Sequence, residues 1–402
     1  MKKTADREAL AVQGGAPVRA TLLPYGRQAV SEADIAAVAE VLRSDWLTTG
    51  PKVGEFEEAF AAAVGVRHAV SFSSGTAALH GAAYAAGLSA GDEAITSPMT
   101  FCATANCVLY QGARPVFADV CGDTLNLDPE RAREALTAKT KAILAVDYAG
   151  HAADLDALLG MAEERGLTLI EDASHALGGE YRGRRVGSVA HMTTFSLHPV
   201  KHVTTGEGGV VTTNRADLAE ALRRFRNHGI SSDARQRQSA GQWHYEMVLL
   251  GMNYRLPDIN CALGLSQMQR LPENVARRRA IAAEYGVRLA GVSGLILPVT
   301  REGVNPAWHL YPVRVEAAVR AEVFRALRAE NIGVNVHYIP VHLHPYYRER
   351  FGYRGGEYPV AEGAYEQLIS LPMFHAMTER DVEDVIGAVE KVFGWYAGEG
   401  VR

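Results

Sequence analysis

The sequence predicts an α/β protein built on a mostly parallel, seven-stranded sheet with helices on both faces. Short apolar runs of strand length alternate with helix-like segments through the first half of the chain, which is the pattern of repeated βαβ units. Two runs, 193–196 and 209–213, lie close together, which fits one local reversal of strand direction. The other five expected strands span 69–72, 93–96, 115–120, 142–147 and 167–170.

The length of the chain predicts two domains of unequal size. A chain of 402 residues is too long for one small core. A helical stretch after Pro257, bent near Pro272, should link the domains. The predicted parts are an N-terminal segment (1–30), a large domain (31–256), linking helices (257–294) and a small α+β domain (295–402). The small domain should contain a strand at 309–315, a helix at 317–331, a strand at 334–338 and helices after 359 and 378.

A helix is expected to begin after Ser31. Ser31 and Asp34 have the spacing of a capping box, which satisfies backbone N–H groups at a helix start. Ile35, Val38 and Leu42 then recur on one side of the helix. We expect this apolar stripe to pack on the large domain.

Composition excludes several classes of protein. Hydrophobic residues make up 48% and charged residues 22%, as in ordinary globular chains. A net charge of −5 and a pI near 6.3 argue against a nucleic-acid partner. The uncharged run 94–113 carries Pro98, Asn106 and Gln111, so we expect no membrane span. Four cysteines without metal-type spacing indicate a reducing cytoplasm, and the start MKKTADREALAVQGG predicts a poorly ordered terminus without a signal peptide.

A lysine near a strand end is the first candidate for chemistry. Lys201 lies in FSLHPVKHVTTGEGG, between an expected strand and a Gly-rich turn. A short loop on a rigid sheet can hold the amine still and partly desolvated, as a Schiff-base lysine requires. An arbitrary lysine is usually a solvated surface charge, so neighbouring motifs have to support the assignment.

Two further motifs supply such support. Asp172 follows an apolar strand in IEDASHALGGEY, where a parallel strand opens onto a cleft. It could keep the pyridine nitrogen of pyridoxal phosphate protonated, or it could cap the next helix together with Glu171. Upstream, SSGTAALHG places Gly75 and Thr76 at the start of an Ala-rich helix, which indicates either a phosphate cup or an ordinary βα turn.

These three motifs, in this order and with GMNYRLPDINCALGLSQM at 251–268, resemble the DegT/DnrJ/EryC1/StrS family of sugar aminotransferases. The resemblance covers nearly the whole chain, from SDWLTTGPKVGEFEEAF at 44–60 to VHYIPVHLHPYYRERF at 336–351. VDYAGHAADLDAL and WHYEMVLLGMNYRL look most like the branch that aminates carbon 4 of a UDP-linked 4-keto-6-deoxy-N-acetylhexose, an altrosamine precursor, in pseudaminic acid biosynthesis. AWHLYPVRV also resembles the branch that makes UDP-4-amino-4-deoxy-L-arabinose.

The resemblance implies a fold-type I, pyridoxal phosphate-dependent transaminase. Such an enzyme takes the amino group of L-glutamate, holds it as pyridoxamine phosphate and gives it to a UDP-linked 4-keto sugar. Lys201 would be the Schiff-base and proton-shuttle residue. The resemblance further implies a cytoplasmic homodimer with shared active sites.

The resemblance also assigns binding roles to individual residues. Phe101 would stack on the cofactor ring, Asp172 would face its nitrogen, and His175 would replace a commoner glutamine beside its phenolic oxygen. The phosphate would be held by Gly75, Thr76, Ser196 and, from the partner subunit, Asn253. The sugar nucleotide would contact Tyr25, Gly26, Leu47, Thr48, Thr49, His337 and Tyr338. Arg255 could receive the donor carboxylate.

Three alternative functions remain to be weighed. A metal hydrolase could use the pair His198 and His202 or the later histidines at 337, 342 and 344, but no HExxH is present and a proline splits the first pair, so we expect no metal. Relatives with histidine at the lysine position are sugar dehydratases, whereas Lys201 is present here. A non-catalytic regulatory relative would not need the intact set of lysine, aspartate, serine and asparagine.

Overall fold

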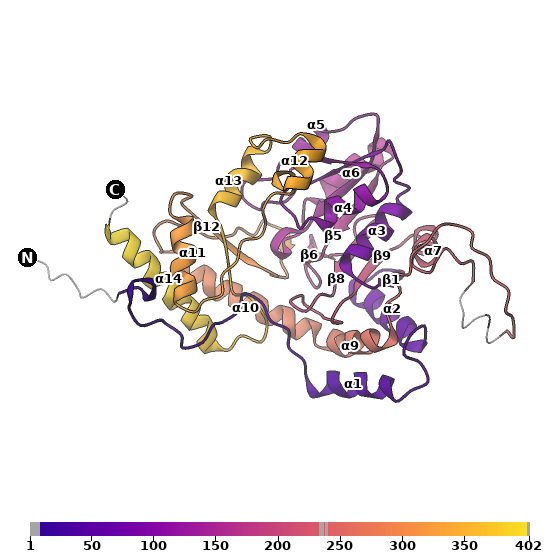
Figure 1. Cartoon of the computed structure of the whole chain (residues 1–402), viewed down its shortest axis with the longest axis horizontal. Helices are drawn as coiled ribbons and strands as arrows, with labels where there is room; N and C mark the ends of the chain where they lie inside the picture. Colours follow the sequence, from indigo (N-terminus) through magenta and orange to yellow (C-terminus); the bar gives the residue numbers. More distant parts are fainter. Residues whose placement is uncertain (1–8, 233–236, 238–239, 400–402) are drawn as a thin grey trace, which may run out of the picture.

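The computed structural model describes residues 9–232, 237 and 240–399, and a seven-stranded sheet lies at its centre (Figure 1). The strand order is β1-β9-β8-β5-β4-β2-β3. β9 runs antiparallel to both of its neighbours, and all other pairs are parallel, as the sequence predicts. The strands are β1 (His68–Phe72), β2 (Glu93–Thr96), β3 (Arg114–Phe117), β4 (Thr140–Val146), β5 (Thr168–Asp172), β8 (Met192–Ser196) and β9 (Gly209–Thr213).

Helices cover both faces of the sheet because its central strands are apolar on both sides. Along β4, Ile143 packs in one hydrophobic cluster and Leu144 in the other, since successive side chains of a strand point to opposite faces. One face is covered by α2 (Pro51–Val64) and α6 (Leu155–Arg165). The other is covered by α3 (Gly75–Ala85), α4 (Ala103–Tyr110) and α7 (Ala216–Phe225).

The helix α1 (Glu32–Leu42) begins with the predicted capping box but buries a different face from the one expected. Ser31 Oγ accepts from the Asp34 N–H at 3.2 Å, and the Asp34 carboxylate accepts from the Ser31 N–H at 2.8 Å. The predicted packing of the apolar stripe is wrong, because Ile35 and Leu42 are 52% and 57% exposed. Asp34 instead faces α9 (Asp258–Gln269), where it accepts hydrogen bonds from two side chains of that helix and from Arg270. This buried polar network sets the rotation of α1.

The C-terminal part of the chain follows two linked helices. α9 and α10 (Leu271–Leu289) meet at Arg270, close to the predicted bend. Beyond them lies a three-stranded sheet with a core of its own. The strands of this sheet are β10 (Leu295–Ile296), β12 (Tyr311–Val315) and β13 (Leu368–Leu371). The helices of the C-terminal part are α11 (Arg320–Ala329), α12 (Pro345–Phe351), α13 (Pro359–Gln367) and α14 (Glu379–Glu399). The remaining short elements are α5 (Pro129–Glu134), β6 (Glu180–Tyr181), β7 (Arg184–Arg185), β11 (Val304–Asn305), and the 3-10 helices η1 (Ala11–Gln13), η2 (Tyr148–Gly150) and η3 (Val341–Leu343).

The predicted strand at 334–338 is wrong. Only Asn335 forms a ladder contact there, an isolated bridge to Ser370, and β13 supplies the third strand of this sheet. Val336 and Tyr338 pack in a separate cluster with residues of the large sheet's loops. The segment therefore leaves the small sheet and reaches across to the large one.

The N-terminal segment is held against the C-terminal core. Residues 1–8 of the terminus that we expected to be poorly ordered lie outside the described residues, but the expectation is wrong for its next residues. Leu10 is buried with the C-terminal core, and the Glu330 carboxylate accepts from the backbone N–H groups of Ala11 and Val18 at 2.8 and 2.9 Å. The predicted boundaries at 30, 256 and 294 stay a prediction. Among the described residues, no helix combines the length and the apolar character needed to cross a membrane.

Candidate active site

A cavity of about 480 Å³ opens where the carboxyl ends of the sheet strands meet the C-terminal part of the chain. Such an edge of an open α/β sheet is where ligands usually bind, because polar loop groups converge there. Ten of the residues predicted to bind cofactor or substrate line this cavity: Tyr25, Gly75, Thr76, Phe101, Asp172, His175, Ser196, Lys201, His337 and Tyr338. The structure thus brings together residues that are up to 313 positions apart, Tyr25 and Tyr338.

The Lys201 amine lies at the base of this cavity. Burial away from water lowers the pKa of Lys201 to about 7. The negative charge of the Asp172 carboxylate acts in the opposite direction and raises this pKa. At pH 7 roughly half of the amines are then neutral, compared with roughly one in 3,000 for an ordinary lysine. A neutral amine has a free lone pair, so Lys201 can act as a nucleophile toward a carbonyl and can accept a proton.

Asp172 is held in one orientation at the end of β5. One carboxylate oxygen accepts from Thr104 Oγ1 at 2.7 Å, and the other accepts from the Ser174 hydroxyl at 2.6 Å and from its N–H at 3.2 Å. The carboxylate still lines the cavity. An oriented carboxylate at this place can face a cationic ring nitrogen, as the chemistry of pyridoxal phosphate requires.

Two further acids are buried near Asp172: Glu171, which the sequence analysis named as a possible helix cap, and Asp147, which it did not single out. Asp147 and Glu171 are fully buried neighbours, and burial raises the pKa of both carboxyl groups. Glu171 accepts from Thr193 Oγ1 at 2.6 Å, and Asp147 accepts from the Ala153 N–H at 2.9 Å. Desolvation and the mutual repulsion of two adjacent carboxylates both favour the protonated form of these groups.

The predicted phosphate cup has the geometry of an anion site. Ser74 caps α3, and its Oγ accepts from the Ala77 N–H at 3.1 Å, while Gly75 and Thr76 form the first turn. A Cβ at Gly75 would lie 2.9 Å from Ser196 Cβ and 3.1 Å from its Oγ, so only glycine leaves this space open. The unpaired N–H groups and the dipole of a helix start favour a phosphate there.

A buried imidazole faces the other side of the cavity. The His175 Nε2 atom lies 3.0 Å from the Tyr338 hydroxyl, whereas its Nδ1 atom has no hydrogen-bond partner among the described residues. Burial and the nearby Lys201 charge keep the pKa of His175 well below its usual value, so the ring is neutral. Phe101 is exposed at the cavity wall, with its ring 6.1 Å from that of Tyr338. A flat ligand between these groups would complete the contacts that Phe101 and His175 leave open, so the residues fit pyridoxal phosphate.

His309 is a cavity residue that the sequence analysis missed. Its Nε2 atom lies 3.4 Å from Lys201 Nζ, the nearest polar side-chain contact of that amine. The AWHLYPVRV segment was noted only for its resemblance to other proteins, and no spacing rule pairs His309 with Lys201 across 108 residues. The burial of His309 could not be predicted from the pattern of apolar residues in the strand that follows it.

Six of the residues predicted to contact ligands lie outside the cavity of this chain: Gly26, Leu47, Thr48, Thr49, Asn253 and Arg255. Gly26 lies close behind the cavity wall, since a Cβ there would be 3.3 Å from Val200. Leu47, Thr48 and Asn253 are exposed. Arg255 donates to Asn227 Oδ1 at 2.8 Å instead of facing the cavity.

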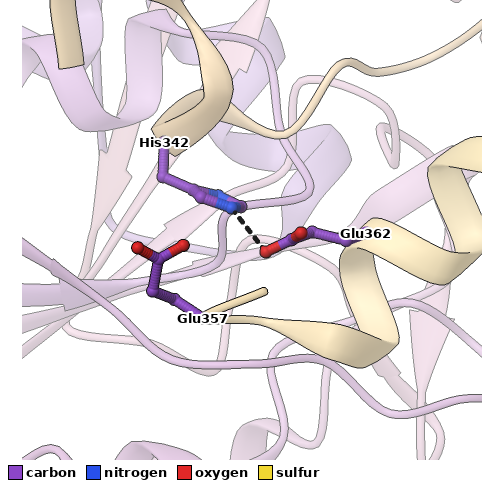
Figure 2. A group of neighbouring side chains, drawn as sticks. All are labelled: His342, Glu357 and Glu362. Atoms are coloured by element: carbon purple, nitrogen blue, oxygen red, sulfur yellow. Dashed lines mark hydrogen bonds and ion pairs between the residues drawn. The ribbon is translucent and has the colours of Figure 1, made fainter. Parts of the chain in front are cut away.

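The histidines weighed as metal ligands have other contacts. His202 Nε2 lies 3.0 Å from the Ala307 carbonyl oxygen, and His198 is exposed. Figure 2 shows the one group of possible metal ligands among the described residues, His342 with Glu357 and Glu362. His342 Nε2 lies 2.9 Å from Glu362, and both glutamates also accept backbone N–H groups of residues 354–356. These contacts fasten the loop before α13, which is a structural use of all three side chains.

Comparison with known proteins gives a family match over most of the chain. The model of the DegT/DnrJ/EryC1/StrS aminotransferase family matches residues 28–390. The spore coat polysaccharide biosynthesis protein SpsC of Bacillus subtilis is 43% identical over 376 residues, 92% of this chain and 97% of SpsC.

Solved structures agree with this match. PseC of Helicobacter pylori, an aminotransferase involved in the biosynthesis of pseudoaminic acid, superposes with a TM-score of 0.87 at 32% identity, over 94% of this chain and 100% of PseC. The putative sugar aminotransferase Spr1654 of Streptococcus pneumoniae, in its PMP form, has a TM-score of 0.88 at 31% identity, over 93% of this chain and 99% of Spr1654. Its PLP form has a TM-score of 0.87 at 30% identity, over the same shares of both chains.

Proposed function

Because the chain belongs to the DegT/DnrJ/EryC1/StrS aminotransferase family, we propose that it transfers the amino group of L-glutamate to carbon 4 of a UDP-linked 4-keto-6-deoxy-N-acetylhexose. The chain is a sugar aminotransferase with the predicted fold, and pyridoxal phosphate is its cofactor, as predicted. The proposal adds the donor, the nucleotide, the sugar and the carbon that is aminated. It is supported by the likeness to PseC and by the sequence stretches that resemble its branch of the family.

The observation that carries the proposal is one cavity lined by a lysine of lowered pKa, an oriented aspartate and an anion cup. When bound, pyridoxal phosphate carries the amino group between the two substrates and stabilises negative charge at the carbon that loses a proton. Lys201 contributes an amine that is neutral about half the time at pH 7, so it would hold the cofactor through its aldehyde carbon with loss of water, and its Nζ can accept and return a proton.

The other chain groups hold and orient the cofactor in this proposal. Asp172 faces the ring nitrogen and stabilises its proton, because three hydrogen bonds keep the carboxylate in place. Gly75, Thr76 and Ser196 hold the phosphate, and Phe101 stacks on the ring. His175 presents its unpartnered Nδ1 edge to an oxygen on the ring.

We also propose a cytoplasmic homodimer. Part of the described chain between α7 and α9 extends away from the rest (Figure 1), and Trp243 and Leu250, which lie between these two helices in the sequence, are 84% and 79% exposed. Large apolar side chains gathered on an extended segment are costly in water and are typical of a protein interface. Asn253 ends this segment, so a second copy can bring it to the partner's phosphate cup. All four cysteines are unpaired, which suits a reducing compartment.

The sugar nucleotide occupies the outer part of the cavity in this proposal. Tyr25, His337 and Tyr338 line the cavity, and its volume of about 480 Å³ is in the range of small-molecule sites. Gly26 lies behind this wall. The loop with Leu47, Thr48 and Thr49 lies outside the cavity of its own chain, so in this proposal it contacts the nucleotide bound to the second subunit.

The decisive experiment offers the purified enzyme L-glutamate and one of three UDP-linked acceptors. These are the L-arabino 4-keto-6-deoxy-N-acetyl sugar, its D-xylo epimer and a 4-keto-pentose, and NMR of the product gives the position and stereochemistry of the new amine. We expect the L-arabino sugar to be preferred and Lys201→Ala protein to be inactive. Preference for the 4-keto-pentose would favour the aminoarabinose activity instead, and no amination of any UDP-sugar would reject both.

A further inference from the structure

Arg278 is a fully buried cation in the middle of α10. Among the described residues, no carboxylate accepts a hydrogen bond from it, and its partners are backbone carbonyl oxygens. Burial lowers the pKa of Arg278 to about 10, which still leaves the guanidinium charged at neutral pH. Burying a charge without a counter-ion costs several kcal/mol unless hydrogen bonds compensate it, and an apolar residue would fill the same space at lower cost.

The carbonyl groups that Arg278 binds belong to three separate segments around the cavity. Nη1 donates to the carbonyl oxygens of Trp308, His309 and Met373 at 3.1, 3.3 and 3.0 Å. Nη2 donates to the carbonyl oxygen of Val200 at 3.3 Å. A planar guanidinium with several fixed N–H directions restricts the relative placement of all these groups, which a flexible ammonium cannot do.

Two of these segments carry a cavity residue at or beside the bonded carbonyl, and the third is bonded to a cavity residue. Val200 directly precedes Lys201, and the His309 side chain reaches the Lys201 amine at 3.4 Å. The third segment bonds the cavity wall through the Met373 N–H, which donates to the Tyr25 carbonyl oxygen at 2.9 Å. One side chain therefore spans both ends of the Lys201–His309 contact.

We propose that Arg278 is a positioning residue that locks the Lys201 loop against the segment bearing His309, so that the lysine amine and the imidazole stay within hydrogen-bond reach. The inference rests on the proposed function in one respect, which is that Lys201 is the reactive amine. His309 is buried and neutral, because burial and nearby charges hold its pKa well below the usual value. Its Nε2 atom lies 3.4 Å from the amine nitrogen, within hydrogen-bond reach.

The Arg278 charge has a second effect on the same amine. A fixed positive charge nearby disfavours the ammonium form, and it adds to desolvation in lowering the pKa of Lys201. Asp172 acts in the opposite direction. Placement and charge are tested by different variants, because lysine at position 278 lacks the planar fork, whereas methionine at this position removes the charge.

The test compares Arg278→Lys and Arg278→Met with a matched control, Arg279→Lys. Arg279 also lies on α10 and donates to three carbonyl oxygens, but those belong to Gly178, Asn305 and Pro306, away from the Lys201 loop. The first measurement uses cofactor-free protein: an amine-directed acylating reagent is applied across pH 5–10, and mass spectrometry of the Lys201 peptide gives the titration midpoint. The second measurement is kcat and KM of the holoenzyme.

The expected results differ for each variant. Arg278→Lys lowers kcat about tenfold or more with little change in KM, since small misplacement of a reacting group is costly. Arg278→Met lowers kcat as well and moves the midpoint to higher pH. Arg279→Lys stays within twofold of wild type in both measurements.

Two outcomes would overturn the inference. Wild-type kcat in Arg278→Lys rejects the positioning role, and an unchanged Lys201 midpoint in folded Arg278→Met rejects the effect of the charge. If Arg278→Met does not fold, Arg278→Lys still decides the positioning role. An active Lys201→Ala enzyme would instead refute the proposed function, whereas an inactive Lys201→Ala with a wild-type Arg278→Lys would refute only this inference.

Discussion

Replacing Gly75 by alanine should close the phosphate cup. The added methyl carbon would lie 2.9 Å from Ser196 Cβ, 3.1 Å from its Oγ and 3.2 Å from its Cα. Unstrained carbon contacts are ~3.5–4.0 Å, so the new contact is too short by about 0.6 Å or more. Ser196 cannot retreat easily, because it pairs with Gly209 at the end of β8. The first turn of α3 must move instead, and this turn carries the N–H groups aimed at the phosphate.

The size of the effect follows from the cost of overpacking. Inserting a methyl group into a filled site costs ~1–3 kcal/mol. If that strain opposes cofactor binding, the Kd for pyridoxal phosphate rises about 5- to 150-fold at 1.4 kcal/mol per tenfold. Pyridoxal without its phosphate should lose much less affinity, because it does not use the cup.

The assay titrates cofactor-free protein with pyridoxal phosphate or pyridoxal and follows absorbance, with thermal unfolding measured in parallel. Gly54→Ala is the matched control, since Gly54 lies inside α2 with no atom within 4 Å of an added Cβ. That change should stabilise the helix by ~0.5–1 kcal/mol and leave both Kd values within twofold. A Gly75→Ala protein that binds pyridoxal phosphate within twofold of wild type, with unchanged unfolding, would refute the reasoning.

Three further predictions follow from the same site. Because the pKa of Lys201 is about 7, cofactor uptake by cofactor-free protein should slow about tenfold per pH unit below 7 and level off above 8, and a midpoint near 10 would contradict the assigned environment. Asp172→Asn should lower kcat ~100-fold or more in steady-state assays, because an amide cannot stabilise a cationic ring nitrogen, and activity within threefold of wild type would rule that role out. Mixing inactive Lys201→Ala and Asn253→Ala protomers should restore activity through one intact site per mixed dimer. No recovery after proven subunit exchange would count against a shared site.

Local sequence was enough to place the residues of the cavity that lie at strand ends. Lys201, Asp172 and Gly75 each follow a recognisable apolar strand, and the carboxyl ends of parallel strands meet along one edge of a sheet, so their convergence could be predicted. The strand order itself was not needed for this. The α/β fold class followed from the alternation of strand-like and helix-like runs, and the cofactor followed from the family resemblance that these motifs carry.

Other features of the site depend on contacts that no local pattern encodes. His309 and Arg278 look like ordinary residues of a strand approach and a helix, and only the packing of distant segments sets them beside Lys201. The stripe of α1 with Ile35 and Leu42 has helical spacing, yet the buried polar network of Asp34 turns it outward.

The segment at 334–338 shows the same limit. Its apolar residues suit a strand, but Val336 and Tyr338 pack against a cluster that includes loop residues of the large sheet. Periodicity determines which residues a chain can bury, because it follows from the geometry of one element. Which partner buries them is decided by competition between surfaces far apart in the chain, and only the tertiary structure resolves that competition.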